Sequence, residues 1–242
     1  MHSYAPLSLR TTLLTLFIIL STSPLFAQTH IPAGDVDGTW TLTGSPFYID
    51  GNISIQDGTT LTIEPGVEVI FTGPYQLDVQ GELFAEGTST ELITFTSNAP
   101  DGWNGIAFDE TPATNSSIIS YCILENGKKD IDRRCTIYPE YCGGAIYVRA
   151  YSGLDISHSI LRNNEASRGG AIYCVAQSGD ASPSIHDNEI HDNTAARGGG
   201  ICCRADTGAT VQPDITDNSI HHNTAWNRGG GIFADNLATP NI

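Results

Sequence analysis

The sequence predicts an all-β protein, a right-handed parallel β-helix in which three short strands form each coil of a solenoid. In the first half, apolar residues alternate with polar ones in short runs such as 61–63 and 67–71, and turn pairs such as Pro65-Gly66 separate the runs. Matching runs recur after 24 residues (53 to 77), 22 residues (61 to 83) and 26 residues (67 to 93). Three strands in about two dozen residues are typical of this solenoid.

The second half repeats more literally, through two motifs. One motif is Gly-Gly-(Ala/Gly)-Ile, which ends at Ile146, Ile172, Ile201 and Ile232. The other is Ile-x-x-Asn, which covers 160–163, 190–193 and 220–223, with further copies at 185–188 and 215–218. We expect each Ile to stack on its copy in the next coil at about 4.8 Å. We expect each Asn amide to hydrogen-bond to the copies above and below it.

The chain divides into a targeting segment and one solenoid. Residues 1–27 have the charged, apolar and small-residue regions of a secretory signal, with cleavage expected after Ala27. Residues 28–50 are expected to be a lead-in and cap. Residues 51–242 are expected to form the β-helix, with a loop inserted at 127–141 and a truncated C-terminal end, because the last motif has no polar closing element after it.

The charge of the chain restricts its partners. The formal net charge is −16, and loss of Arg10 with the signal would make it −17. Such a surface repels nucleic acid and anionic membranes as a whole, so no nucleic-acid partner is expected. No second long apolar run follows the signal, so no transmembrane helix is expected either. The predicted location is secreted or on a bacterial outer surface.

The cysteines suggest structural roles. Cys174 and Cys203 each follow a motif Ile by two places, so both should face inward in adjacent coils, either as a disulfide or as stacked small apolar residues. Cys135 and Cys142 lie in and beside the insertion, where a disulfide would staple a long loop. The cysteine spacing matches no zinc pattern.

An arginine precedes each of the last three glycine pairs, at Arg168, Arg197 and Arg228. Stacking of the coils should align these arginines in a column. The column is either a track for an acidic polysaccharide, in which one arginine could serve as a base in lyase chemistry, or an exposed ladder paired with acids such as Glu165. The base role requires a strongly perturbed pKa, since arginine is otherwise protonated.

Acidic residues also align. Asp187 and Asp217 should stack and could bind Ca²⁺ through carboxylate oxygens, or they could cap turns on a solvated polar face. The neighbouring His191 and His221 should align as well. Tyr147, Tyr173 and Phe233 follow motif Ile residues and should point outward, with Cys202 interrupting their column.

The repeats carry a family resemblance. Gly-Gly-(Ala/Gly)-Ile together with Ile-x-x-Asn resembles the repeats of chlamydial-type polymorphic outer membrane proteins, in which the second motif usually begins with Phe. The run 60–67, Thr-Leu-Thr-Ile-Glu-Pro-Gly-Val, looks like the opening coils of secreted bacterial β-helix proteins of the pectate-lyase-like superfamily. Such families imply an extracellular location, and they include adhesins and polysaccharide-active enzymes.

The sequence therefore predicts a non-catalytic, adhesin-like or glycan-contacting scaffold whose partner is a polysaccharide or cell-surface glycan. It contains no Gly-x-Ser-x-Gly elbow and no phosphate loop. One alternative is a polysaccharide lyase with the arginines, Asp187 and Asp217 in one groove. The other is a structural stalk for a further C-terminal domain.

Overall fold

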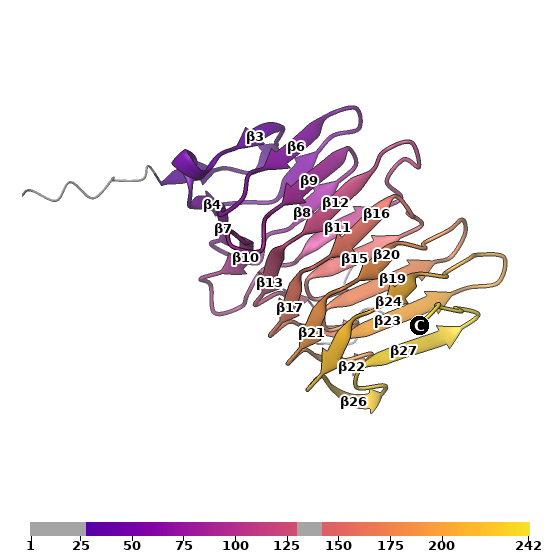
Figure 1. The fold of residues 1–242 in the computed structure, drawn as a ribbon. Helices are drawn as coiled ribbons and strands as arrows, with labels where there is room; N and C mark the ends of the chain where they lie inside the picture. The colour runs from indigo at the N-terminus through magenta and orange to yellow at the C-terminus, as the bar shows by residue number, and fades with distance from the viewer. Residues whose placement is uncertain (1–27, 130–141) are drawn as a thin grey trace, which may run out of the picture.

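The computed structural model describes residues 28–129 and 142–242. Strands pair in parallel with strands of the preceding and following coils, and the coils stack along one axis from the indigo end to the yellow end (Figure 1). The all-β parallel β-helix is therefore confirmed. The one helix in these ranges is the three-residue η1 (Leu42–Gly44). No helix in the described ranges has the length and apolar character of a membrane span.

Four sheets form the walls of the solenoid. Sheet 1 contains β1 (Thr29–Ile31), β4 (Phe47–Ile49), β7 (Glu68–Phe71), β10 (Ile93–Ser97), β13 (Cys122–Glu125), β17 (Ile160–Arg162), β21 (Glu189–His191) and β25 (Ser219–His221). Sheet 2 contains β2 (Gly34–Asp35), β5 (Ile53–Ile55), β8 (Leu77–Val79), β11 (Ile106–Asp109), β15 (Ile146–Arg149), β19 (Ile172–Ala176), β23 (Ile201–Ala205) and β27 (Ile232–Asn236).

Sheets 3 and 4 complete each coil. Sheet 3 contains β3 (Gly38–Trp40), β6 (Thr60–Ile63), β9 (Glu82–Glu86), β12 (Ser117–Ser120), β16 (Leu154–Ser157), β20 (Ser184–His186) and β24 (Asp214–Thr216). Sheet 4 contains β14 (Lys128–Lys129), β18 (Glu165–Arg168), β22 (Thr194–Arg197) and β26 (Thr224–Arg228). In the later coils the chain therefore runs through sheets 3, 1, 4 and 2 in that order.

The core consists of columns of apolar side chains that run along the axis. The motif isoleucines of sheet 2 pair in register, as the spacing predicts, in the series Ile146, Ile172, Ile201 and Ile232. The first three of them are fully buried. A strand contributes only a few inward side chains, so each coil depends on its neighbours for burial. Burial of such a side chain contributes roughly 1.5–3 kcal/mol.

Sheet 4 departs from the predicted three-strand coil. In the later coils, the segment that follows sheet 1 and precedes the glycine pair is long enough to form a strand. This strand pairs with the equivalent strand of the next coil, so these coils have four sides. The glycine pair then turns the chain sharply into sheet 2. Gly169 has φ +60°, and a Cβ there would lie 2.0 Å from the Ile172 carbonyl oxygen. A Cβ on Gly170 would lie 2.1 Å from the Gly199 carbonyl oxygen, so both positions require glycine.

Asparagine ladders stabilise the turns. Between sheets 1 and 4, the Asn193 Nδ2 donates to the Leu161 carbonyl at 2.8 Å and to Asn223 Oδ1 at 3.0 Å. Its Oδ1 accepts hydrogen bonds from the backbone and side-chain nitrogens of Asn164, each at 3.0 Å. Asn188 and Asn218 form a second ladder between sheets 3 and 1. The predicted hydrogen bonding of the Asn amides between coils is confirmed for these positions.

The predicted alignment of one Ile-x-x-Asn copy, 160–163, is wrong by one residue. Leu161, and not Ile160, pairs with Ile190 and is fully buried, whereas Ile160 is partly exposed. Likewise Asn164, and not Asn163, occupies the ladder. The two apolar residues in succession hid the true register, and a slip of one residue moves every side chain of a strand to its other face.

The segments predicted from the sequence can be placed as follows. Within residues 28–50, β1, β2 and β3 are the outermost strands of their sheets and pair in register with the next coil. The insertion at 127–141 begins with β14, which pairs with β18 as part of sheet 4. The expected signal at 1–27 and the rest of the insertion lie outside the described residues.

The register correction gives a direct test. We expect Leu161→Ala to lower the free energy of unfolding by about 2–5 kcal/mol, because it leaves a cavity in the core column. Ile160→Ala should cost less than about 1 kcal/mol, because its side chain lies on the outer face. Urea unfolding followed by circular dichroism measures both, and equal losses would contradict the assigned register.

A second test concerns the Asn ladder. Asn193→Ala should cost at least about 2 kcal/mol, because it leaves a buried Asn164 N–H and other buried polar groups without partners, at about 1–3 kcal/mol each. The matched control is Asn227→Ala on exposed β26, which should be nearly neutral. The midpoints of thermal unfolding compare the two variants, and a neutral Asn193→Ala would refute the importance of the ladder.

Candidate functional site

The three predicted arginines form a column on sheet 4. Arg168 pairs with Arg197 across β18 and β22, and Arg197 pairs with Arg228 across β22 and β26. The last pairing includes a register irregularity, which does not disturb the alignment of the two arginines. The arginine column is defined by these three residues. Its alignment confirms that the glycine motif fixes the register of the residue before it.

The three arginines have different surroundings. Arg168 is buried, with 6% of its surface exposed, and its Nη1 donates to the Tyr173 hydroxyl at 3.2 Å. The Arg197 Nη1 forms an ion pair with Asp235 Oδ2 at 3.0 Å, and its guanidinium carbon lies 6.0 Å from the Phe233 ring centroid. Arg228 is exposed. The column is therefore neither a uniform exposed ladder nor a uniform track.

The column adjoins the outer face of sheet 2, where the sequence predicts a column of outward-pointing aromatic residues. Tyr147, Tyr173, Cys202 and Phe233 stack in register there, away from the main core, as predicted. Tyr147 and Tyr173 are nonetheless only 1% exposed, because they belong to a second apolar cluster with Cys142, Val175 and their neighbours. Their ring faces are thus closed to a sugar, and only Phe233 is partly exposed.

The sequence-based prediction of the site does not include several charged residues of this region. Arg149 hydrogen-bonds to Asp109, and Arg204 forms an ion pair with Asp206 at 3.0 Å. Lys129 is buried and donates to Gln76 Oε1 at 2.5 Å. Arg149 and Arg204 share one repeat position, three residues after a motif Ile, but Val175 lies between them and the spacing gives no sign of their acidic partners. Their contacts join segments up to 53 residues apart.

The electrostatics do not favour Arg168 as a base. Burial lowers the pKa of Arg168, but its interactions with Tyr173, Cys202 and Asp235 together outweigh burial, so the pKa stands above its ordinary value. Burial raises the pKa of Tyr173 to about 12, with a further contribution from Cys202. Both groups therefore keep their protons at neutral pH. They can donate hydrogen bonds, whereas general-base catalysis requires a pKa near the working pH.

Asp187 and Asp217 lie at a different corner. They occupy equivalent turn positions between sheets 3 and 1, with φ of 54° and 55° and exposed side chains. The arginine column lies at the corner between sheets 4 and 2, and the strands of sheets 1 and 4 separate the two corners along each coil. The structure does not bring these aspartates and the arginines into one groove.

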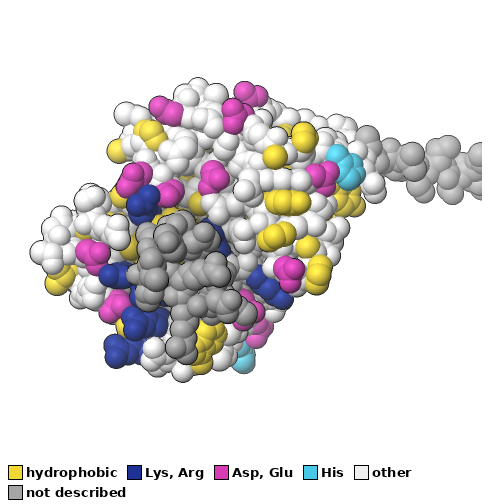
Figure 2. All heavy atoms as spheres, turned by 180° about the vertical axis from the view of Figure 1, so that it is seen from behind, with side chains coloured by type: hydrophobic (Ala, Val, Ile, Leu, Met, Phe, Trp, Pro, Cys, Tyr) yellow, Lys and Arg dark blue, Asp and Glu magenta, His cyan; other side chains and the backbone are white. Residues whose placement is uncertain are grey.

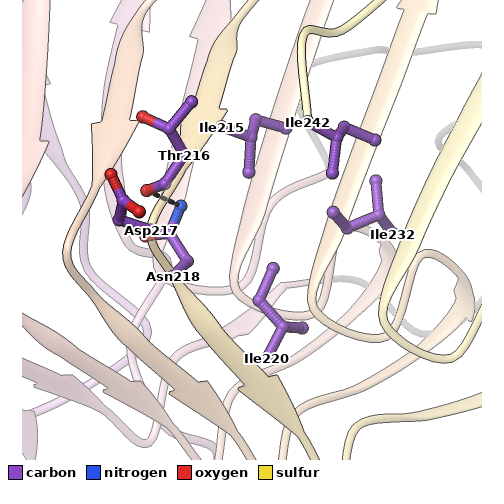
Figure 3. A pocket seen from close by; sticks show the side chains of 7 residues that line it. All are labelled: Ile215, Thr216, Asp217, Asn218, Ile220, Ile232 and Ile242. Carbon is purple, nitrogen blue, oxygen red and sulfur yellow. Dashed lines mark hydrogen bonds between the residues drawn. The ribbon is translucent and has the colours of Figure 1, made fainter.

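The two aspartates have different surroundings. Asp187 Oδ2 contacts His186 Nδ1 at 2.9 Å, and Asp155 Oδ2 contacts the other ring nitrogen at 3.1 Å. Asp217 lies beside an apolar pocket of about 360 Å³ lined by Ile215, Ile220, Ile232 and Ile242 (Figure 3). Among the described residues, no group of three His, Cys, Asp or Glu side chains is arranged to hold a metal ion. The predicted alignment of His191 with His221 is confirmed, with stacked rings 5.2 Å apart.

The cysteines lie where the repeats place them. Cys174 and Cys203 pair in register inside the core, fully buried, and both are free thiols. Of the two alternatives, the structure therefore has the stacked small residues. Hydrogen bonding to Cys174 and burial raise the pKa of Cys203 well above its ordinary value, so it remains an unreactive thiol. Cys142 is disulfide-bonded, and Cys135 lies outside the described residues.

Comparisons of the chain with protein-family models, with curated proteins and with solved structures find no significant match. The assignment of function therefore depends on the residues themselves.

The contacts of His186 predict a pH effect. The hydrogen bonds to Asp187 and Asp155 outweigh burial and raise the pKa of His186 above 6.5. Because the folded pKa is raised, the stabilisation by His186 is fully present below pH about 6.5 and is lost as pH rises through the folded pKa. The difference in unfolding free energy between the wild type and His186→Gln should therefore shrink as the pH rises from about 6.5 through the folded pKa of His186.

NMR titration of the imidazole protons tests the cause. Asp187→Asn should lower the pKa of His186 toward its ordinary value. Asp217→Asn, at the same position in the next coil, is the matched control and should have a smaller effect. An unshifted His186 in Asp187→Asn would show that the contact has no electrostatic role.

Proposed function

We propose that this chain is a non-catalytic scaffold, secreted or displayed at the cell surface, that contacts an acidic glycan through the face formed by sheets 2 and 4. The observation that supports this proposal is the separation of charge in a strongly acidic protein. Seven of the eight Lys and Arg residues in the described ranges lie on strands of these two sheets. The seven are Lys128, Lys129, Arg149, Arg168, Arg197, Arg204 and Arg228.

The acidic residues are distributed in the opposite way. The strands of sheets 2 and 4 contain five of the 24 acidic residues in the described ranges, and 19 lie elsewhere with one base, Arg162. Seen from behind, dark blue side chains gather on one face (Figure 2). A polyanion is repelled by the rest of the surface, so this face is where it can approach. Guanidinium groups suit carboxylate and sulfate because they donate two parallel hydrogen bonds.

The arrangement gives less support to the lyase alternative. That mechanism requires a base and acidic groups at one place, whereas the arginine column and Asp187 lie at different corners, and the pKa of Arg168 is raised. A repeated cationic face without such convergence fits binding better than bond cleavage. The chain's expected signal at 1–27 fits export to a compartment where acidic polysaccharides occur.

The proposal predicts binding of a polyuronate such as polygalacturonate, without binding of neutral dextran, and weakening of the affinity by added salt. Arg228→Glu, an exposed site on the proposed face, should weaken binding by up to about fivefold, since an exposed charge contributes up to about 1 kcal/mol. Affinity electrophoresis or calorimetry measures the effect.

The matched control is Arg162→Glu on sheet 1, which carries the same charge change on another wall. Equal weakening in both variants would indicate net charge alone and would contradict a specific face. Absorbance near 235 nm, recorded in the same samples, detects unsaturated uronates. A steady rise would establish lyase activity and overturn the non-catalytic assignment.

A further inference from the structure

The corner between sheets 4 and 2 carries more positive charge than its acids neutralise. Arg168, Arg197 and Arg204 all lie close to Tyr173 or Asp235, as their contacts and charge interactions record. Asp235 forms its ion pair with Arg197. Arg204 pairs with Asp206, which leaves the positive charge of Arg168 without an ion-pair partner among the described residues. Among Arg168, Arg197 and Arg204, one positive charge is therefore unmatched by acids of the described residues.

Arg168 is the residue that makes this corner unusual. A guanidinium has five N–H donors, yet the single hydrogen bond of this buried side chain within the described residues goes to the Tyr173 hydroxyl. A buried charge is costly unless it is paired and hydrogen-bonded. Arg197 stacks directly beside it at the strand spacing, and neighbouring like charges on a sheet are destabilising. Within the described part of the chain, Arg168 therefore lacks a negatively charged partner with several acceptor atoms.

Tyr173 and Arg204 contribute two further donors to this corner. The Tyr173 hydroxyl accepts the hydrogen bond from Arg168 and, with its pKa raised to about 12, keeps its own proton to donate. The Arg204 Nε is buried without a hydrogen-bond partner in the described residues. Arg197 keeps 29% of its side-chain surface exposed, so the corner opens to solvent on the Arg197 side. The donors of Arg168, Arg197 and Tyr173 come from three neighbouring strands, β18, β22 and β19.

We infer that Arg168, Arg197 and the Tyr173 hydroxyl form a binding site for one oxyanion, a carboxylate or sulfate group. Such an anion supplies the missing negative charge and enough oxygen atoms for the unused N–H donors of Arg168. The inference deepens the proposed function, because a uronate carboxylate or a sulfate ester on a glycan would be the group bound. The same oxygens are present in free inorganic sulfate, so the site can be tested apart from the glycan.

The first experiment is calorimetric titration of the full chain with sodium sulfate at constant ionic strength, with chloride as the balancing anion. We expect saturable binding with one sulfate per chain. Arg168→Gln should weaken it at least tenfold, because it removes the buried charge but keeps a polar side chain. Arg162→Gln, on sheet 1, is the control for loss of one positive charge and should leave the affinity unchanged.

Tyr173→Phe provides a second variant that keeps the charge and the ring. We expect it to weaken sulfate binding about threefold or more, since it removes one hydrogen-bond donor to the anion. Melting temperatures with and without sulfate show that each variant is folded. Absence of saturable binding to the wild type, or equal affinity in wild type and Arg168→Gln, would overturn the site.

The site and the proposed function can fail separately. Polygalacturonate and free glucuronate are titrated in parallel with sulfate. Sulfate binding that depends on Arg168, without polygalacturonate binding, would support the site and contradict the glycan function. Polygalacturonate binding that is unchanged in Arg168→Gln, without sulfate binding, would support the function and refute this site. Glucuronate competition with sulfate would support a shared carboxylate and sulfate site.

Discussion

The structure depends on the in-register stacking of parallel strands, which places each side chain about 4.8 Å from its copy in the next coil. Stacking on an identical residue is stabilising for some residue types and destabilising for others. Isoleucine gains apolar contact from a copy of itself, as in the Ile146 and Ile172 column. Asparagine also gains, since its amide donates and accepts at once, as Asn193 does with Asn223. Charged residues gain nothing from stacking on like charges.

The charged columns show how the protein meets this constraint. On sheet 1, Arg162 pairs in register with Glu125 and forms an ion pair with it at 2.8 Å. On sheet 2, Arg149 pairs in register with Asp109. Each of these two columns thus places an acid directly beside a base, as the stacking energy favours.

The arginine column is the exception, because its register neighbours carry like charges. Arg168, Arg197 and Arg228 succeed one another without an intervening acid on sheet 4. Asp235 reaches Arg197 from a different sheet, and the one side-chain hydrogen bond of Arg168 to a described residue goes to the neutral Tyr173. The repulsion between these stacked arginines marks a position where a bound external anion would neutralise the excess positive charge.

The repeats allowed much of the fold to be predicted, because periodicity reports contacts between neighbouring copies. The glycine motif fixed the Ile column and the alignment of the arginines, since every copy has the same length up to the isoleucine. Periodicity failed where a copy was ambiguous, as at Ile160 and Leu161, where both residues are apolar. It also gave no sign of the fourth sheet, whose strands carry small and polar residues.

The surroundings of the candidate site were harder to predict, because they join different sheets. Asp235 lies 38 residues after its partner Arg197, and no motif relates the two positions. The outward direction of Tyr173 followed from alternation, but its burial depends on a second apolar cluster that includes Cys142. A sequence pattern reports which face a side chain occupies. It does not report what covers that face.

The same stacking constraint bears on the choice between binding and catalysis. Catalysis requires unlike groups at one point, with an acid, a base and a substrate in reach of one another. A repeat instead places like groups on successive strands, as in the arginine column, and it separates unlike groups such as Arg168 and Asp187 to different corners. Where they reach the surface, as at Arg197 and Arg228, like groups on successive strands suit a polymer that presents the same anionic group repeatedly. Each contact is then weak, and the summed affinity comes from several contacts made by one connected ligand.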